Sequence, residues 1–341
     1  MASITLSRSN YFYNLDQVAK RVKNIDQIAV VLKDNGYGHG LTHIGELAKE
    51  YGISRAVVRT YSEALQIKEL FDNTLILAPE KIVFNNSLSY TINSIHDIEK
   101  FPKKCRVELK VDTGMHRLGI NIDEVKIALK LIRDRELNLI GVFTHYREAD
   151  ELSSVYFWQR EEFQKIKEIV KSEKFENIVF HSNNSAGTFR QKDIIQDEIV
   201  RVGIASYGYL PDNKALQFPE LKPVLSLYAD RVGFQKAKKG YRVGYGGILE
   251  IEDEEYIGIY DIGYGDGFRR IPVEAIQNKQ FKTADGSYLL GKVSMDSIAL
   301  NSRRNRVLLF NSVKVLSNIF NTIDYEILVT LSPDIKRVIV E

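Results

Sequence analysis

The sequence predicts an α/β protein: a (β/α)8 barrel of the TIM type, followed by a smaller, mostly β C-terminal domain. Its 341 residues exceed the length at which a single core usually stops growing. Short apolar runs alternate with amphipathic segments up to about residue 210, as β–α units do. Beyond about residue 221, strand-like runs are separated by Gly and Asp instead. We therefore expect a barrel over residues 1–221 and a β domain over 222–341.

Each run expected as a barrel strand is short, and most are uniformly apolar, as strands buried on both faces should be. About eight such runs suggest a closed barrel rather than an open sheet. An open doubly wound sheet would place a glycine-rich phosphate turn after its first strand, but here that turn carries Lys33 and an aromatic residue. The expected strands are 28–33, 56–61, 74–78, 89–95, 107–111, 139–145, 177–181 and 199–202.

Four connections between these runs have helical spacing, and two begin with acidic helix-start signals, Ser62 with Glu63 and Asp123 with Glu124. The third and fourth connections are short and show no convincing helix. In the C-terminal part we expect strands with little helix among them. The expected helices are 41–51, 62–71, 123–135 and 155–173, and the expected C-terminal strands are 224–236, 256–260, 288–293 and 307–316.

Charge and composition favour small-molecule chemistry. Lys and Arg number 47 against 45 Asp and Glu, a net charge of +2, which gives no sign of a nucleic-acid partner or an anionic membrane. Cys105 is the single cysteine, which excludes an internal disulfide and a cysteine-clustered metal site. Residues 1–14 resemble neither a signal peptide nor an anchor, and no run approaches the roughly 20 apolar residues of a membrane span. We expect a cytoplasmic protein.

Polar side chains end the expected barrel strands, where barrels carry their chemistry. Lys33 follows the first apolar run, and a lysine amine partly withdrawn from water there can act as a Schiff-base nucleophile. On position alone, a lysine that reaches solvent is the more common interpretation, because lysines often end strands. The other polar residues at these ends are Lys110 with Arg117, His145, His181 with Asn184 and Ser185, and Arg201.

Ser185 and the backbone at Gly203–Ile204 follow the seventh and eighth runs, where barrels often bind a phosphate. Ordinary turn chemistry explains each feature separately. Together with Lys33 they suit a phosphorylated aldehyde, pyridoxal 5'-phosphate (PLP). The glycine-rich run 36–40 lacks the P-loop and Rossmann spacings, and the scattered histidines offer no metal-ligand spacing, so we expect no metal.

Residues 29–40 place a lysine before a Tyr-Gly-His-Gly run, and this segment resembles the PLP-lysine motif of bacterial alanine racemases. Further matches follow in the order of that family, and the resemblance spans nearly the whole chain. The matching segments are 109–119, 144–145, 184–186, 201–204, 244–246, 263–267, 294–296 and 324–326.

The resemblance implies that Lys33 holds PLP covalently, that His145 packs on the cofactor ring and that Arg201 faces the pyridine nitrogen. An arginine stays charged and does not accept a proton, so it should leave that nitrogen unprotonated and weaken the electron sink. The residues that the resemblance assigns to the phosphate are Tyr37, Ser185, Gly203, Ile204 and Tyr325.

Racemisation calls for two bases, and the resemblance assigns Lys33 to one face of the substrate and Tyr245 of a second subunit to the other. It therefore implies a homodimer with shared active sites. A tyrosine in a Gly-Tyr-Gly turn is, taken alone, more often a packing residue. The implied reaction is the interconversion of L- and D-alanine, which supplies D-alanine for peptidoglycan.

For a small amino-acid substrate, the resemblance implies that Arg117 contacts the carboxylate and that Lys110 matches a lysine carbamylated in many members. From the residues alone, Lys110 could equally pair with Asp112 or Glu108. The remaining implied residues are Met115, Met295 and Tyr264 for substrate binding, with Asp296 in a supporting role.

Some positions depart from the family pattern: Lys292 stands in place of the usual arginine, Ser294 in place of cysteine, and the C-terminus is short and atypical. A broad-specificity racemase acting on serine, lysine or arginine stays open as an alternative. Related decarboxylases carry a glutamate where this chain has Arg201, which disfavours that reaction. A non-enzymatic PLP-binding homeostasis protein would share the barrel and the lysine but not the second domain with Tyr245.

Overall fold

The computed structural model describes all 341 residues, which form two compact units. The barrel unit comprises Tyr11–Gly36 and Ile44–Lys222. The sheet unit comprises Met1–Asn10, Tyr37–His43 and Pro223–Glu341. This division is more interleaved than a single cut after residue 221, because the first ten residues and a short loop after Lys33 join the C-terminal part of the chain.

The barrel unit contains eight parallel strands in the order β10-β2-β3-β4-β5-β6-β8-β9, which confirms the predicted fold class. Phe180 in β9 forms a parallel bridge to Glu198, just before β10, and so nearly closes the ring. Every run predicted as a barrel strand overlaps one of these strands. The strands are β2 (Ile28–Val31), β3 (Arg55–Val58), β4 (Asn73–Ile76), β5 (Leu88–Ile92), β6 (Arg106–Asp112), β8 (Asn138–Phe143), β9 (Val179–His181) and β10 (Val200–Val202), and the two-residue β7 (Ile120–Asn121) pairs with β6.

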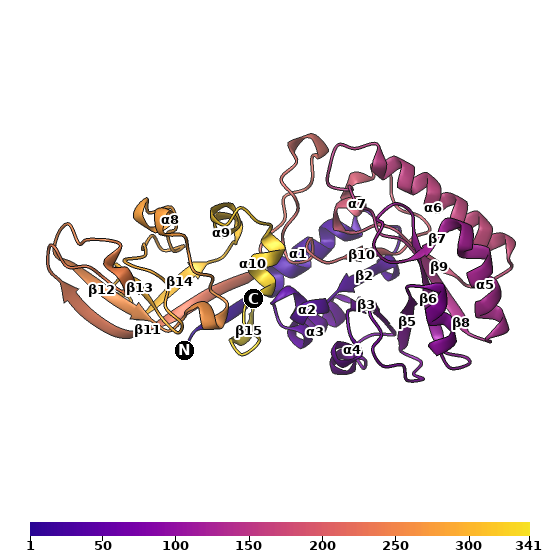
Figure 1. The fold of residues 1–341 in the computed structure, drawn as a ribbon, viewed down its shortest axis with the longest axis horizontal. Coiled ribbons are helices and arrows are strands. Elements are labelled where there is room, and N and C mark those ends of the chain that lie inside the picture. Colours follow the sequence, from indigo (N-terminus) through magenta and orange to yellow (C-terminus); the bar gives the residue numbers. More distant parts are fainter. The chain divides into compact units, whose positions relative to one another are not determined.

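Helices pack outside the barrel strands, and Figure 1 shows α5 and α6 along one side of this unit. All four predicted helices are present. The start of α4 was predicted at Ser62, but Thr60 is the N-cap: its side chain accepts from the Glu63 amide, and the Glu63 carboxylate accepts from the Thr60 amide. The helices over this part of the chain are α1 (Arg8–Ala19), α2 (Lys33–Tyr37), α3 (Leu41–Tyr51), α4 (Tyr61–Ile67), α5 (Val125–Asp134), α6 (Val155–Ser172) and α7 (Ser185–Arg190).

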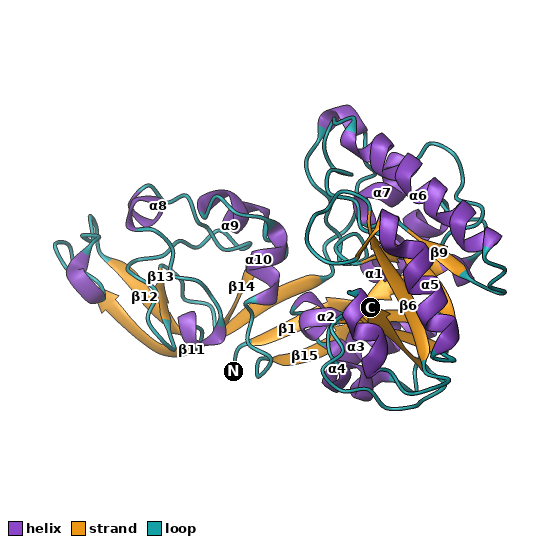
Figure 2. Ribbon diagram, turned by 45° about the vertical axis from the view of Figure 1, so that its right-hand side comes forward, coloured by secondary structure: helices purple, strands orange, loops and turns teal.

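The sheet unit is built on a sheet of order β13-β12-β11-β1-β15, with β14 also paired to β11. β1 lies between strands from the other end of the chain, antiparallel to β11 and parallel to β15 (Figure 2). The elements of this unit are β1 (Ser3–Ser7), β11 (Leu225–Ala237), β12 (Glu255–Tyr260), β13 (Ile298–Leu300), β14 (Arg306–Phe310), β15 (Lys336–Val340), α8 (Val273–Gln277), α9 (Lys314–Ile319) and α10 (Asp324–Val329).

Two strand predictions in this unit were wrong in part. Residues 288–293 form only isolated bridges, and Gly291 packs so closely on Val243 that a Cβ would lie 2.7 Å from its carbonyl oxygen. In this segment the backbone makes the close contact with Val243 and does not form a continuous β ladder. The predicted strand 307–316 divides into β14 and α9. β1, β13 and β15 were not predicted. No helix of the structure has the length and apolar character that a bilayer crossing requires.

Candidate active site

Lys33 stands two residues after β2, at the carboxyl end of the barrel strands. The chain then makes a left-handed turn, with φ of 54° at Asp34, 55° at Asn35 and 59° at Gly36. Non-glycine residues adopt such angles at a cost of about 1 kcal/mol or more, and Asp, Asn and Gly tolerate them best. The turn is held from the start of α4, because the Asp34 amide donates to Oε1 of Glu63 at 2.6 Å.

The Asp34 carboxylate sits between two cations. Its Oδ1 lies 3.0 Å from a guanidinium nitrogen of Arg59, and its Oδ2 lies 3.7 Å from Nζ of Lys33. The Lys33 side chain is about one third exposed, at 35%. The lysine therefore stands at the start of this turn with its side chain partly exposed.

His145 lies two residues beyond β8 and is surrounded by positive charge. Burial first, and then four cations of the barrel unit in the order Arg201, Lys110, Arg117 and Lys33, together lower its pKa to about 3. The imidazole is therefore neutral near pH 7. The structure thus brings four other residues predicted for the site, all cationic, close to the uncharged His145 ring.

Arg201 is a buried guanidinium in β10. One of its terminal nitrogens donates to Nδ1 of His181 at 2.9 Å, and the other donates to the Thr144 carbonyl at 2.6 Å. Burial lowers its pKa to about 10, with Glu108 opposing that shift most strongly. With this pKa, Arg201 is still charged at neutral pH. Its hydrogen bond to the carbonyl of Thr144, the residue before His145, holds the positive charge close to that imidazole.

Lys110 is buried in β6, and burial, Arg117 and Arg201 lower its pKa to about 8. The carboxylates that the sequence offered as partners are engaged elsewhere. Asp112 accepts four backbone amides of residues 114–117, from 2.8 to 3.2 Å, which fixes the loop that carries Arg117. Glu108 binds His181 instead. Lys110 is therefore an amine with a substantial neutral fraction beside the other cations.

Ser185 and Gly203 meet after β9 and β10, as predicted. The Ser185 hydroxyl oxygen accepts from the amides of Gly203 and Ala205, both at 3.2 Å. Asn184 caps α7 by accepting from the Gly187 amide at 2.9 Å. Ile204, between the two donors, is buried. The two loops thus form one turn in which backbone amides converge on a hydroxyl.

In the sheet unit, the loop with Tyr37 packs on α10, which carries Tyr325. The two rings have centroids 5.8 Å apart. The Gly38 carbonyl accepts from Arg337 at 2.8 and 3.1 Å, so this arginine near the C-terminus holds the loop. No local sequence pattern indicates this contact, because the two residues are 299 positions apart.

Tyr245, Tyr264 and Met295 are exposed in the single chain, at 71%, 44% and 55%. Tyr264 and Met295 are neighbours, because the Tyr264 amide donates to the Ser294 carbonyl and the next amide donates to the Met295 carbonyl. Asp296 follows on the same loop and is also exposed. Tyr245 sits between glycines with φ of 67° and 75°, and Nζ of Lys292 lies beside the second of them.

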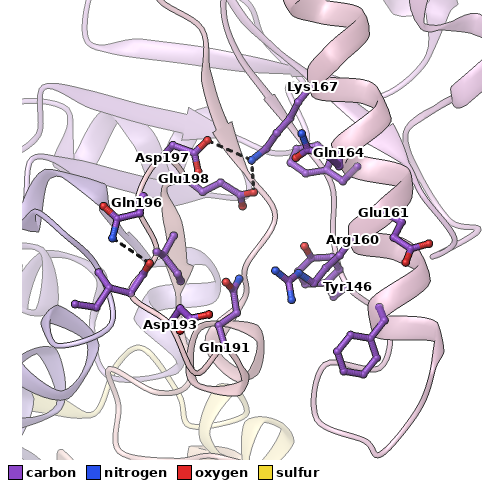
Figure 3. Close-up of a pocket in the computed structure, with 14 residues that line it drawn as sticks. Tyr146, Arg160, Glu161, Gln164, Lys167, Gln191, Asp193, Gln196, Asp197 and Glu198 are labelled. Atoms are coloured by element: carbon purple, nitrogen blue, oxygen red, sulfur yellow. Dashed lines mark hydrogen bonds and ion pairs between the residues drawn. The ribbon is translucent and has the colours of Figure 1, made fainter.

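A separate cavity of about 520 Å³ opens between α6 and residues 191–198 on the outside of the barrel (Figure 3). Lys167 reaches Glu198 there at 2.6 Å and Asp197 at 3.8 Å. Glu198 in turn accepts from the amide and hydroxyl of Ser182. No predicted site residue lines this cavity. Its ion pair instead fixes the chain where β9 ends, three residues before Ser185.

Glu108 and the partners of His181 were missed in the sequence. The available signal was an acidic residue inside the apolar run 107–111, where a buried carboxylate needs a partner. No group of three or more His, Cys, Asp or Glu side chains is arranged to hold a metal ion.

The carboxyl ends of the barrel strands therefore combine a partly exposed lysine, a cluster of other cations and a turn of convergent amides. These features, with a second, sheet-based unit, define a class of (β/α)8-barrel proteins whose strand ends suit an anionic ligand.

The particular family follows from comparison with known proteins. Residues 6–211 match the family described as alanine racemase, N-terminal domain, and residues 224–339 match alanine racemase, C-terminal domain. The chain belongs to the alanine racemase family.

The relatives cover the whole chain. An alanine racemase of Campylobacter jejuni subsp. jejuni is 40% identical, covering 100% of both chains. One from a Nitratiruptor species is 40% identical over 99% of both. The crystal structure of alanine racemase from E. faecalis has a TM-score of 0.85 at 27% identity, covering 99% of this chain and 98% of that chain. These relatives support neither the broad-specificity alternative nor the homeostasis protein.

Proposed function

We propose that this chain interconverts L- and D-alanine with PLP as its cofactor. The observation that carries the proposal is the position of Lys33, at the carboxyl end of β2 beside a cluster of cations. Membership in the alanine racemase family supports both the reaction and the substrate. D-alanine is a building block of peptidoglycan, so the proposal includes action in the cytoplasm, where its precursors are made.

The residues of the barrel unit fit PLP by the chemistry of their donors. Lys33 supplies an amine for the aldehyde carbon, and Ser185 with the Gly203 and Ile204 backbone supplies hydroxyl and amide donors for the phosphate. The neutral His145 imidazole offers a flat surface for the ring, since burial and nearby cations hold its pKa at about 3. By family resemblance, Tyr37 and Tyr325 also bind the phosphate.

PLP, when bound, withdraws electrons from the substrate and so acidifies the proton on Cα. Arg201 sets how strong that withdrawal is. Because it is charged and only donates hydrogen bonds, it does not protonate the pyridine nitrogen. The resulting weak electron sink limits side reactions and requires a base close to Cα on each face.

The two bases are Lys33 and Tyr245 of the partner subunit. Nζ of Lys33 takes or returns a proton on one face of Cα, and the phenolic oxygen of Tyr245 does so on the other. The side chains of Tyr245, Tyr264 and Met295 are all exposed in the single chain, and their exposure supports a surface that a second subunit covers. We accordingly propose a homodimer with shared active sites.

Arg117 binds the substrate carboxylate, and Lys110 orients Arg117 after carbamylation. The neutral Nζ of Lys110 attacks the carbon of CO2. A nitrogen–carbon bond forms as one carbon–oxygen π bond breaks with its electron pair moving to that oxygen, and the nitrogen then loses one proton to water. With a pKa of about 8, roughly one tenth of this amine is neutral at pH 7. Met115, Met295 and Tyr264 limit the space for the substrate side chain, and Asp296 supports their loop.

The test is a purified protein loaded with PLP. We expect a yellow preparation that forms D-alanine from L-alanine, and a Lys33→Ala variant that has lost both the bound colour and the activity. Lys130→Ala, an exposed lysine on α5, is the matched control and should keep both. A colourless wild type that is fully active would overturn the cofactor assignment.

A further inference from the structure

A chain of hydrogen bonds crosses the interior of the barrel from β6 through β9 to β10. Oε2 of Glu108 lies 2.7 Å from Nε2 of His181, and Nδ1 of the same imidazole lies 2.9 Å from a guanidinium nitrogen of Arg201. All three side chains are buried, with 2%, 3% and 6% exposure. An acid, an imidazole and a guanidinium are thus linked beneath the proposed site.

The partners of His181 determine its tautomer. A guanidinium has only donors, so Nδ1 of His181 must accept and carries no proton. Nε2 then carries the ring proton and donates it to Glu108. Burial lowers the pKa of His181 despite the contact with Glu108, in keeping with a neutral ring. The imidazole is therefore a one-directional link, a donor toward Glu108 and an acceptor toward Arg201.

Hydrogen-bond donors hold the Glu108 side chain in place in its ionised, carboxylate form. Its Oε1 accepts from the Ser89 hydroxyl at 2.7 Å and from the Asn73 amide nitrogen at 3.2 Å. The Asn73 amide cannot turn over easily, because its oxygen accepts from Arg106 at 3.0 Å. Burial alone would raise the pKa of Glu108, but its donors, His181 first, hold it below the usual value.

The neighbouring strand leaves room for this carboxylate. Gly141 in β8 faces it, and a Cβ at that position would lie 3.0 Å from Oε2 of Glu108. The three side chains that hydrogen-bond to the Glu108 carboxylate, Asn73, Ser89 and His181, all donate to it, and the glycine provides the space that the carboxylate occupies.

We infer that Glu108 is a positioning residue that, by fixing the tautomer of His181, holds the Arg201 guanidinium in the orientation it needs toward the cofactor ring. The inference rests on the proposed function, since it takes Arg201 as the group that faces the pyridine nitrogen. Its first step, the tautomer, concerns this chain alone.

Glu108→Gln turns this inference into a defined change at His181. Two fixed donors, Ser89 and Asn73, compete for the single amide oxygen, so the amide NH2 should face Nε2 of His181. Nε2 must then accept, and the ring proton moves to Nδ1, where it faces the donors of Arg201. Two donors cannot share that contact, so the guanidinium must move.

The first measurement uses protein without cofactor, labelled with 15N in histidine. Protonated and unprotonated ring nitrogens have well-separated chemical shifts. We expect the wild type to show a proton on Nε2 of His181 and Glu108→Gln to show it on Nδ1. A wild type protonated on Nδ1 or on both nitrogens, or a Glu108→Gln variant with an unchanged tautomer, would overturn the inference.

The second measurement follows PLP binding by its absorbance. Loss of a buried charged hydrogen bond costs on the order of a factor of ten in affinity, so we expect roughly tenfold weaker binding and a shifted absorption band in Glu108→Gln. A changed tautomer with unchanged affinity and spectrum would refute the link to Arg201. If the wild type binds no PLP, the proposed function fails, while the tautomer result still stands.

Two further variants separate positioning from folding. Ser89→Ala removes one hydrogen bond to Glu108 but leaves its charge and its contact with His181, so it should keep the wild-type tautomer and spectrum. Gly141→Ala leaves Glu108 unchanged but pushes on its carboxylate, so it should shift the spectrum in the same direction as Glu108→Gln, by less. If Ser89→Ala changed the tautomer as much as Glu108→Gln does, a general packing effect would explain the change and the inference would be overturned.

Discussion

Gly38 approaches Leu328 so closely that a Cβ on the glycine would lie 2.0 Å from the leucine carbonyl oxygen. Its φ of 79° also falls where side chains are strained. This contact joins the loop that carries Tyr37 to α10, which carries Tyr325.

Gly38→Ala should therefore destabilise the protein strongly. The backbone of the loop or of α10 must shift, which we expect to cost about 3 kcal/mol or more. The control is Gly240→Ala, with a similar φ of 86° and nothing within 4 Å of the new Cβ, which should cost only about 1 kcal/mol. Thermal unfolding without cofactor compares the two, and equal losses would show that backbone strain alone matters.

His145 should make the barrel sensitive to acid. Its pKa is about 3 in the folded protein against an ordinary value of 6.5, so below pH 6.5 the unfolded chain binds a proton that the folded one does not. The contribution of His145 is complete above pH 6.5 and is lost as the pH falls toward 3, by at most about 1.4 kcal/mol per pH unit and less with solvent screening.

The test compares urea unfolding of the wild type and His145→Gln from pH 7 to pH 4.5. Carboxylates affect both proteins alike, so the difference isolates the imidazole. We expect a shallower loss of stability in the variant, whose side chain does not titrate. Parallel curves for the two proteins would contradict a neutral, desolvated His145.

Lys110 should react with CO2. In 13C-labelled bicarbonate, we expect a carbamate carbon signal from the wild type and none from Lys110→Arg, because an arginine keeps the charge but offers no neutral amine. Lys130→Arg on the barrel surface should leave the signal unchanged. A signal that persisted in Lys110→Arg would assign the carbamate to another amine.

Tyr245→Phe should impair proton exchange at Cα unequally. Without the phenolic oxygen, exchange into solvent should fall by about a hundredfold or more starting from one enantiomer of alanine, and much less starting from the other. Proton NMR in heavy water measures both rates. Tyr241→Phe, another exposed tyrosine of the sheet unit, should leave both unchanged. An equal fall in the two rates would exclude one-sided action by Tyr245.

The barrel was predictable because most of its strands are buried on both faces, so that segments such as 28–32 and 74–78 are almost entirely apolar. The strands of the sheet unit were harder to predict from the sequence. β1 pairs with strands more than 200 residues away, and residues 288–293 follow a close backbone contact at Gly291 that no local pattern reports.

Within the site, strand ends indicated Lys33, His145 and Arg201, because parallel strands present their carboxyl ends on one side. The role of Glu108 was hidden. Its partners Ser89 and His181 come from other strands, and only the closed barrel brings their donors to one carboxylate.

The position of β1 also sets an order of events during synthesis. Residues 3–7 are synthesised long before their partners at 336–340. The parallel side of β1 therefore stays unpaired until those partners have been made. The barrel segments between 44 and 222 do not pair with that stretch and can begin to condense on the nascent chain, so completion of the sheet unit should be the later step.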